Sequence, residues 1–286
     1  MLICPHCQTA LQPIDQCGYR CKAYRCENNH SFDVGKAGDV NLLLPNQKRS
    51  KNPGDSKAMV GARRDFLASD VYQPIAELLA KYITMLGQGE AQIIADAGCG
   101  EGYYLRQVQR LCYPNLDCSN SNYFTDNGGA FIGWDISKYA VQSAAKQSTF
   151  SAKWLTASNA AIPIADNQID ILLSNFGFEV ADEFARVVKS GGYVMTLDVG
   201  EKHLLELRKL IYPSIKPYHA KLPLSVLTLL KEDSLQYEIT LSAQQIAQLM
   251  LMTPHFYRAT QQAKEKLSQR TKLSVTVSVL LRIYRV

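Results

Sequence analysis

Short apolar runs alternate along the chain with segments in which apolar residues recur at helical spacing. The first clear run, residues 93–95, ends at the acidic Asp96, and a glycine-rich turn and helix-forming sequence follow it. A run, a turn and a helix in this order form the repeating unit of α/β proteins. The predicted strands are residues 93–96, 130–135, 153–156, 169–174, 193–198, 237–241 and 274–284. The predicted helices are residues 73–83, 101–111, 138–146 and 183–189, with a turn at 189–192.

The last predicted strand differs from the earlier ones because apolar and polar residues alternate along it. Val275, Val277, Val279 and Leu281 fall on one face of residues 274–284. This alternation is typical of an antiparallel strand that closes a sheet. The pattern as a whole therefore predicts an α/β fold with a Rossmann-like, mixed sheet of seven strands.

The chain has 286 residues, enough for one such domain and a small additional module. Its first residues lack the basic and apolar regions of a signal peptide, and no apolar run approaches the roughly 20 residues that cross a bilayer. We therefore expect a soluble, cytoplasmic protein without a membrane partner. In a chain of this kind, eight cysteines indicate thiols or metal ligands more than disulfides.

The N-terminal cysteines have the spacing of a zinc module. Residues 4–7 form a C-x-x-C knuckle, which lets two thiolates reach one tetrahedral ion. A second pair must complete the site, and the candidates are Cys17, Cys21, Cys26 and His30. The C-x3-H spacing of Cys26 and His30 would give a Cys3His site with the knuckle, while Cys17 and Cys21 remain alternatives. In so short a segment the ion would supply most of the folding energy.

Positive charge is concentrated shortly after this module. Residues 48–64 contain six basic residues and one acidic residue, and this excess equals the net charge of +5 for the whole chain. The six are Lys48, Arg49, Lys51, Lys57, Arg63 and Arg64. A basic loop beside a zinc knuckle has the charge to follow a phosphate backbone, so we predict phosphate contacts from all of them except Lys57. The alternative is a solvated linker whose charges have no partner.

The turn after the first strand carries the clearest cofactor motif. Gly98, Gly100 and Gly102 stand two residues apart, and Tyr103 occupies the place of the third glycine in the dinucleotide fingerprint G-x-G-x-x-G. This spacing disfavours NAD. An acidic residue two positions before the first glycine, here Asp96, resembles motif I of the S-adenosylmethionine (SAM) methyltransferases. In that motif the acid and the turn amides receive the amino-acid end of the cofactor, so we predict SAM.

The ends of the next two strands supply the rest of the predicted cofactor site. Asp135 ends its strand and is the expected partner of the ribose hydroxyls, and Asn159 follows the next strand, where adenine is commonly held. Asp135 lies farther from the glycines than the usual roughly 20 residues. The excess, residues 112–129, is rich in Asn, Ser, Asp and Gly and is predicted to be an inserted surface loop.

The substrate is expected at the end of the fourth strand, where residues 175–178 read Asn-Phe-Gly-Phe. This tetrapeptide resembles the loops of amino-methyltransferases, in which an amide binds the base edge and an aromatic ring stacks on the base. The alternative is that Phe176 and Phe178 are plain core residues. Asn175, Phe176 and Glu179 are the candidate catalytic residues, and the sequence does not identify the group that takes the proton.

Several segments, in this order, resemble one family. They are the zinc motif, the basic run at 48–56, Ala62-Arg63-Arg64 with Phe66-Leu67, Tyr72-Gln73-Pro74, and the glycine motif at 98–104. Over nearly the whole chain they look like the bacterial 23S rRNA (guanine-N1-)-methyltransferases, which modify a hairpin loop of the large subunit. The resemblance implies as zinc ligands Cys4, Cys7, Cys26 and His30. It implies cofactor contacts from Tyr72, Gly100, Glu101 and His203.

The resemblance implies transfer of a methyl group from SAM to N1 of a guanine, with 23S rRNA as partner. The residues predicted to bind the cofactor are Tyr72, Asp96, Gly98, Gly100, Glu101, Gly102, Asp135, Asn159 and His203. The residues predicted to bind the RNA are Lys48, Arg49, Lys51, Arg63 and Arg64. We expect a zinc-binding RNA-recognition module at 1–45, a basic linker and helix at 46–70, and the methyltransferase domain at 71–286.

Two segments depart from the family, the loop at 112–129 and the tetrapeptide at 175–178. The second departure leaves two other functions open. One is a non-catalytic, zinc-containing RNA-binding protein with a SAM-sensing core, and the other is a methyltransferase of a different substrate. Neither a DNA nor a small-molecule methyltransferase would explain the zinc module and the basic loop together. The sequence also leaves a homodimer open.

Overall fold

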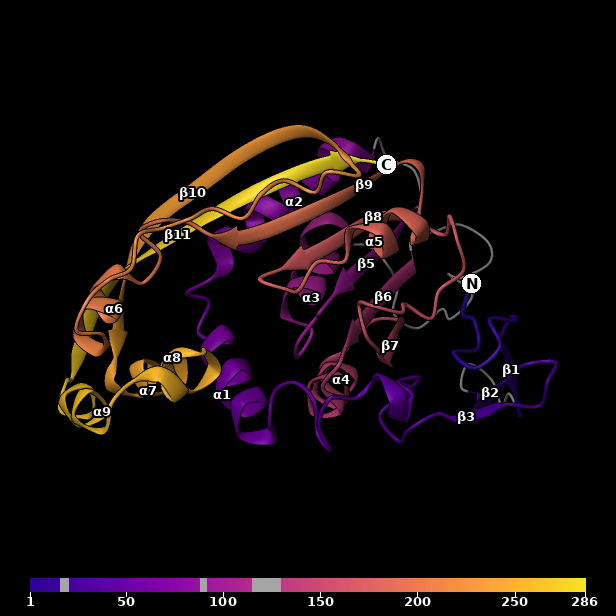
Figure 1. Ribbon diagram of the computed structural model, residues 1–286, viewed down its shortest axis with the longest axis horizontal. Helices are drawn as coiled ribbons and strands as arrows, with labels where there is room; N and C mark the ends of the chain where they lie inside the picture. Colours follow the sequence, from indigo (N-terminus) through magenta and orange to yellow (C-terminus); the bar gives the residue numbers. More distant parts are fainter. Residues whose placement is uncertain (16–20, 88–91, 115–129) are drawn as a thin grey trace.

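The computed structural model describes residues 1–15, 21–87, 92–114 and 130–286. A small sheet lies near the N-terminus, and a large sheet with its helices makes up most of the molecule (Figure 1). Cys17 and nearly all of the predicted loop at 112–129 lie outside the described residues. None of the helices in these ranges has both the length and the apolar character that a membrane span requires.

The large sheet contains the seven predicted strands in a mixed arrangement. Within the described residues its order is β10-β11-β9-β8-β5-β6-β7-β4. The strands are β4 (Asp39–Asn41), β5 (Ile93–Ala97), β6 (Ala130–Asp135), β7 (Ala152–Thr156), β8 (Ile169–Asn175), β9 (Val188–Val199), β10 (Thr228–Ser242) and β11 (Lys272–Arg285). Strands β4 to β9 pair in parallel, and β11 is antiparallel to β9 and β10. The predicted Rossmann-like fold class is confirmed.

β4 is an addition to the predicted seven strands. Asp39, Val40 and Asn41 pair with the last residues of β7 and extend the sheet at its edge. Val40 is buried in the same apolar cluster as Trp134 of β6. A triplet with one apolar residue shows no strand periodicity, so only its long-range pairing defines it.

The predicted helix at 183–189 and turn at 189–192 are placed differently in the structure. Helix α5 covers Ala181–Val187, and β9 begins at Val188. Gly191 has a φ of +81°, and the pairing of β9 with β8 shifts its register beside it. The two glycines of this segment therefore form a bulge inside a continuing strand, because glycine adopts positive φ without steric cost.

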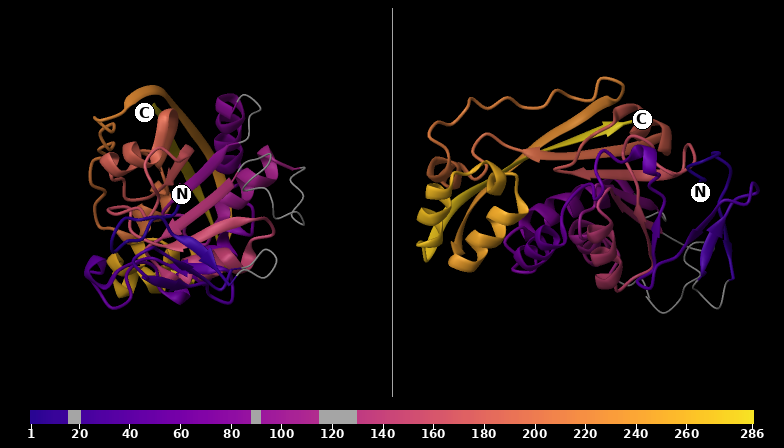
Figure 2. Two further views of the ribbon diagram at one scale, coloured as in Figure 1. Left: turned by 90° about the vertical axis from the view of Figure 1, so that its right-hand side faces the viewer. Right: turned by 60° about the horizontal axis from the view of Figure 1, so that its bottom comes forward.

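The helices near the C-terminal end of the chain form a lobe at one end of the molecule. In the part of the chain that the structure describes, the helices are α1 (Lys57–Leu67), α2 (Gln73–Gly87), α3 (Tyr103–Cys112), α4 (Lys138–Gln147), α5, α6 (Leu205–Ile211), α7 (Ala243–Met252), α8 (His255–Arg258) and α9 (Gln261–Ser268). The last three interrupt the hairpin of β10 and β11 and lie with α6 at the end opposite the N-terminal sheet (Figures 1 and 2). α7 also packs against α1, so the lobe reaches the middle of the molecule.

The N-terminal module is packed directly on the large sheet. Strands β1 (Gln12–Ile14), β2 (Ala23–Arg25) and β3 (Ser31–Asp33) form its antiparallel sheet. Leu2 makes a β-bridge to Ile164 and is buried in the same cluster as Trp134. The module and the large domain therefore share one apolar core.

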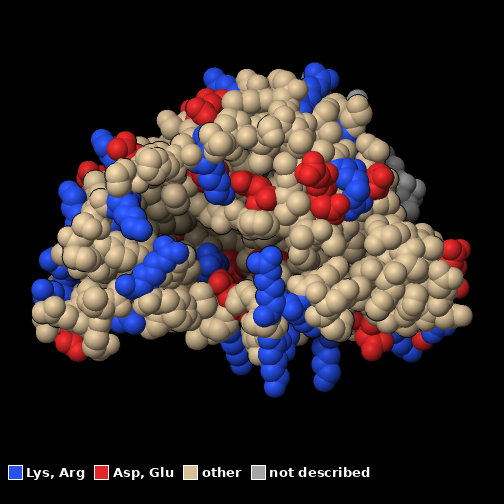
Figure 3. Space-filling model, viewed as in Figure 1, with Lys and Arg blue, Asp and Glu red and all other residues tan. Residues whose placement is uncertain are grey.

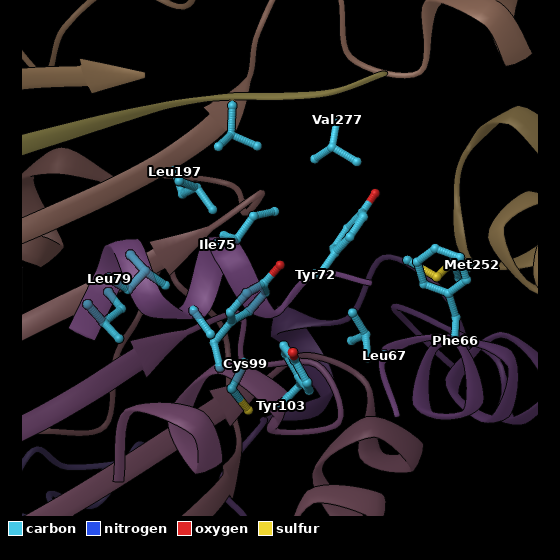
Figure 4. Packing of buried hydrophobic residues seen from close by; sticks show 14 of the residues in the cluster. Phe66, Leu67, Tyr72, Ile75, Leu79, Cys99, Tyr103, Leu197, Met252 and Val277 are labelled. Carbon is cyan, nitrogen blue, oxygen red and sulfur yellow. The ribbon is translucent and has the colours of Figure 1, made fainter. Parts of the chain in front are cut away.

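A second apolar cluster joins α1, α2 and α7 to the sheet. Ile75 and Leu79 of α2 recur at helical spacing and are fully buried. They belong to one cluster with Leu197 of β9, Phe66 of α1 and Met252 of α7 (Figure 4). Their packing fixes α1 beside the carboxyl ends of the parallel strands.

Two glycines provide a test of the packing around the turn between β5 and α3. Gly102 has a φ of +84°, and a Cβ on it would lie 2.8 Å from Trp154 and 2.9 Å from Ala144. Gly61 of α1 has nothing within 4 Å of the corresponding position. We expect Gly102→Ala to lower the free energy of unfolding by about 2–4 kcal/mol through backbone strain and overlap. Gly61→Ala should raise it by about 0.5–1 kcal/mol, because alanine restricts the unfolded chain. Urea denaturation measures both, and equal effects would contradict this account of the turn.

Candidate cofactor pocket and metal site

A pocket of about 330 Å³ lies at the carboxyl ends of β5, β6 and β8. This is the edge at which parallel α/β sheets hold ligands, and the volume suits a small molecule. The turn after β5 lines the pocket together with residues 157–159 and 175–178. Gly54, Asp55 and Arg63 from the N-terminal part also line it, as does Met252 at the end of α7. The site thus collects residues from nearly the whole length of the chain.

The glycine turn leaves one of its sides free for a ligand. Gly98, Gly100 and Gly102 all have positive φ, of 80°, 56° and 84°. A Cβ on Gly98 would meet nothing within 4 Å, and one on Gly100 would meet only Cδ of Arg63, at 3.6 Å. Gly102, in contrast, packs against its neighbours. The first two glycines therefore keep the backbone accessible to a cofactor, and the third anchors the turn.

Asp96 supplies a buried carboxylate directly behind this turn. Its Oδ1 accepts a hydrogen bond of 3.3 Å from Nδ2 of Asn175. Its Oδ2 is buried and has no partner among the described residues. Burial and the nearby charge of Asp135 raise the pKa of Asp96 to about 7. A cation close to this carboxylate would stabilise its charged form, and SAM carries a sulfonium and an ammonium group, so the residue fits that cofactor.

Asp135 and Glu101 also line the pocket, and hydrogen bonds hold both carboxylates. Asp135 is fixed by backbone N–H groups, because its Oδ2 accepts from Gly100 at 3.0 Å and its Oδ1 from Ser137 at 2.7 Å. Oε2 of Glu101 accepts from Arg106 at 2.7 Å, while its Oε1 is buried without a partner in the described chain. Each carboxylate is thus held in one orientation, and together they give the pocket a negative lining.

Six of the nine predicted cofactor residues line the pocket. They are Tyr72, Gly98, Gly100, Glu101, Asp135 and Asn159. The other three, Asp96, Gly102 and His203, are not part of the lining. The His203 ring centroid is 6.4 Å from that of Tyr72 and 6.1 Å from that of Phe176. Burial lowers the pKa of His203 to about 4, so its imidazole is neutral at pH 7 and supports these rings without adding charge.

Two of the candidate substrate residues, Phe176 and Phe178, are exposed at the pocket. Phe178 is 77% exposed and Phe176 is 37% exposed, so neither is a core residue. Asn175 is buried beside them, and all three line the pocket. Phe176 has a φ of +54°, a conformation that a bulky side chain seldom adopts.

Glu179, the third catalytic candidate, does not line the pocket. Its Oε1 accepts from Nζ of Lys221 at 3.1 Å, and the same ammonium contacts Asp198 at 2.6 Å and donates to the carbonyl of Gly177 at 3.2 Å. Burial and the charge of Asp198 raise the pKa of Glu179. The structure therefore places Glu179 in a network that holds the substrate loop from behind. The sequence did not single out Lys221, which has no motif around it.

The predicted RNA-binding residues fall into two groups. Arg49, Lys51 and Arg64 are exposed and Lys48 is half-buried. Arg63 instead lines the cofactor pocket, where its Nη2 donates to Asp55 at 2.7 Å and to the carbonyl of Met252 at 2.9 Å. Asp55 was not predicted as a site residue, although it lies within the basic run.

The predicted metal ligands come together in the N-terminal module. The ligand atoms of Cys4, Cys7, Cys26 and His30 all lie within 4.8 Å of one another. The sulfurs of Cys7 and Cys26 are 3.7 Å apart, and Nδ1 of His30 is 3.4 to 3.5 Å from the three sulfurs. Tetrahedral zinc, with bonds of about 2.3 Å to sulfur and 2.0–2.1 Å to nitrogen, places two sulfurs about 3.8 Å apart and a sulfur and a nitrogen about 3.5 Å apart. The four atoms therefore fit one zinc ion, and the predicted cluster is confirmed.

Metal analysis of single variants distinguishes these ligands from the other cysteines. Cys26→Ala should lose the zinc ion, because it removes one of four protein ligands from a closed site. Cys17→Ala and Cys21→Ala should each keep one ion per chain. Elemental analysis of the dialysed proteins gives the metal content. Zinc loss from the Cys17 or Cys21 variant, with retention in the Cys26 variant, would reverse the assignment.

The raised pKa of Asp96, about 7, predicts pH-dependent cofactor binding. Below that pH its carboxyl is largely neutral, and above it the carboxylate attracts the cationic groups of SAM. The Kd for SAM should therefore rise by up to about tenfold for each pH unit below about 7, and level off above it. Calorimetry across this range measures it, with Asp96→Asn expected to show no such dependence. A wild-type Kd that does not change with pH would contradict the role of Asp96.

Comparisons with known proteins match both parts of the chain. The family model described as RlmA, N-terminal, a zinc ribbon, matches residues 2–51, and the model described as Methyltransferase domain matches residues 95–196. A Streptomyces fradiae protein named 23S rRNA (guanine(748)-N(1))-methyltransferase is 30% identical over 207 residues, which cover 72% of this chain and 66% of that protein. YxjB of Bacillus subtilis (strain 168), provisionally named as a 23S rRNA (guanine-N(1)-)-methyltransferase, is 28% identical over 288 residues, covering 98% of this chain and 95% of that protein.

The two matched regions coincide with the two sites in the structure. The first contains the Cys3His cluster, and the second contains the glycine turn and the strands whose ends form the pocket. The zinc ribbon, the SAM-binding domain and the relatives therefore agree with the resemblance seen in the sequence. The chain belongs to the 23S rRNA (guanine-N1-)-methyltransferase family, in which a zinc ribbon precedes a SAM-dependent methyltransferase domain.

Proposed function

We propose that the protein transfers a methyl group from SAM to N1 of a guanine in a hairpin loop of 23S rRNA. The observation that carries this proposal is the exposed aromatic rim of the pocket, formed by Phe176 and Phe178 beside Asn175. Apolar rings left in solvent at a cofactor site favour a flat base that stacks on them. The names of the relatives, which specify guanine N1 in 23S rRNA, support the same substrate.

The loop at residues 175–178 suits a guanine that is unpaired and turned out of the base stack of the RNA. N1 lies on the Watson-Crick edge, so a guanine must be unpaired before this atom can be methylated. The Phe176 ring centroid lies 6.3 Å from that of Tyr104. The left-handed backbone of Phe176 costs about 1–3 kcal/mol, and we attribute this cost to presenting the ring at the mouth of the pocket. A guanine could then stack on the Phe176 ring with its N1 atom facing the cofactor.

The side-chain amide of Asn175 can bind the Watson-Crick edge of the guanine. Its Nδ2 donates to Asp96, and its Oδ1 is buried without a partner among the described residues. A free carbonyl oxygen accepts hydrogen bonds, and the Watson-Crick edge of guanine presents N–H donors. We propose that Asn175 binds this edge and that the two phenylalanines hold the plane of the base.

The residues of this chain have to orient the base, because the cofactor supplies the reactive group. Bound SAM provides an electrophilic methyl group on a positively charged sulfur. The base must be held with N1 in line with that methyl, at about 3 Å, and the N1 proton must leave. Since Lys221 engages the carboxylate of Glu179 outside the pocket lining, we propose that Glu179 positions the substrate loop and does not take the proton.

The basic segment lies beside the pocket and can hold the RNA backbone. Lys and Arg side chains surround the hollow on one face of the molecule and project below it (Figure 3). We propose phosphate contacts from Lys48, Arg49 and Lys51, which shortly precede in sequence the pocket-lining residues Gly54 and Asp55. Such contacts position an RNA without reading its sequence.

The proposed reaction can be tested on unmodified 23S rRNA with labelled SAM. N1-methylguanosine cannot form a Watson-Crick pair, so reverse transcriptase should stop at one guanine in a hairpin loop. The stop should require both SAM and the protein. Incorporation of label without such a stop would point to another atom, and no incorporation into rRNA would refute the proposed substrate.

A triple variant tests the basic segment. Replacing Lys48, Arg49 and Lys51 by Ala should flatten the plot of log affinity against log salt by roughly two units, because each phosphate contact to single-stranded RNA contributes about 0.7. SAM affinity should not change. Replacing the exposed Lys81, Lys231 and Lys272, which lie on α2, β10 and β11, is the matched control. If both triples change the slope equally, the basic segment is not the RNA-binding surface.

A further inference from the structure

Among the described residues that line the cofactor pocket, acidic residues outnumber basic ones. Asp55, Glu101 and Asp135 line it, and Asp96 accepts a hydrogen bond from Asn175 of the lining. Among the described residues that line it, Arg63 is the only Lys or Arg. SAM carries a positive sulfonium, a positive α-ammonium and a negative α-carboxylate. The acidic residues suit the two cations, and the carboxylate needs a cationic partner.

Arg63 has hydrogen-bond donors left for such a ligand. Its side-chain hydrogen bonds within the described part of the chain, to Asp55 and to the carbonyl of Met252, both use Nη2. Its Nε is buried and has no partner in the described part of the chain. A guanidinium has five N–H donors, so those on Nε and Nη1 remain. The side chain lies against the glycine turn, with Cδ 3.6 Å from the position of a Cβ on Gly100.

The neighbouring Arg64 shows what an outward-facing arginine on this helix looks like. Its side chain is 49% exposed and pairs with Asp65, the next residue. The Arg63 side chain is 29% exposed and belongs to the lining of the pocket. A buried, unpartnered donor in a cofactor site is costly unless a ligand satisfies it. We infer that Arg63 binds the α-carboxylate of SAM, and that it is not one of the RNA-binding residues that the sequence predicted.

Asp55 acts as the positioning residue for this contact. Its carboxylate holds one side of the guanidinium, and its own carbonyl accepts a hydrogen bond of 2.7 Å from the hydroxyl of Ser137. Gly54 is pressed against the same turn, since a Cβ there would lie 2.8 Å from that of Ser137. The end of the basic segment is therefore fixed to the turn after β6, which in turn fixes Arg63. This inference rests on the SAM-dependent activity and does not depend on which RNA is methylated.

Calorimetry with two cofactors isolates the carboxylate. Decarboxylated SAM keeps the sulfonium and a primary ammonium and lacks only the group that Arg63 is inferred to bind. Arg63→Gln should weaken SAM binding on the order of 10- to 100-fold, as expected for a charge-assisted contact. It should change the Kd of decarboxylated SAM by less than about twofold. Arg63→Lys should lie between wild type and Arg63→Gln, and Arg64→Gln should leave both Kd values unchanged.

The Asp55→Asn variant distinguishes direct binding of the SAM α-carboxylate by Arg63 from a general change in the shape of the pocket. It removes the ion pair and keeps the cation, so SAM should bind within a few-fold of wild type. A loss as large as that of Arg63→Gln would overturn the inference, as would an equal loss of both cofactors in Arg63→Gln or no loss of either. Thermal unfolding without cofactor verifies that each variant is folded. Wild-type binding of SAM without methylation of a guanine would refute the proposed function alone and leave this inference standing.

Discussion

The turn between β5 and α3 is the constraint on which the rest of the structure depends. Three glycines with positive φ reverse the chain within a few residues of Asp96. Gly102 locks the turn between Trp154 and Ala144, while Gly98 and Gly100 leave open space on the other side. The backbone can therefore approach a ligand at this one place while the surrounding sheet stays fully packed. The pocket, its acidic lining and the helix α1 beside it are all arranged around this open side.

Electrostatics determines which ligand this open side can accept. A carboxylate as buried as that of Asp96 is unfavourable without a partner, and its pKa rises accordingly. A cationic cofactor relieves that cost, whereas the phosphates of a dinucleotide would add to it. Among the described residues of the lining, the one Lys or Arg is Arg63, which comes from the N-terminal part of the chain. The segment that carries the proposed RNA contacts therefore also completes the cofactor pocket.

Much of this arrangement could be predicted from sequence because it is encoded locally. The apolar runs of β5, β6 and β8, the alternating glycines and the cysteine spacing each depend on a few neighbouring residues. The strand β4, the helices between β10 and β11 and the roles of Arg63 and Lys221 depend on contacts across the chain. Arg63 and Met252, for example, lie 189 positions apart in sequence. A basic residue in a basic run looks like a phosphate contact until its partners are known.

The aromatic rim, together with an Asn175 oxygen that has no partner among the described residues, supports the proposed methylation of guanine at N1. Nucleoside mass spectrometry of 23S rRNA treated with the protein and isotopically labelled SAM measures this directly. We predict one labelled 1-methylguanosine for each rRNA molecule, and its loss with Asn175→Ala while SAM binding persists. Label in any other nucleoside, or equal labelling by the Asn175 variant, would contradict the assignment of this pocket.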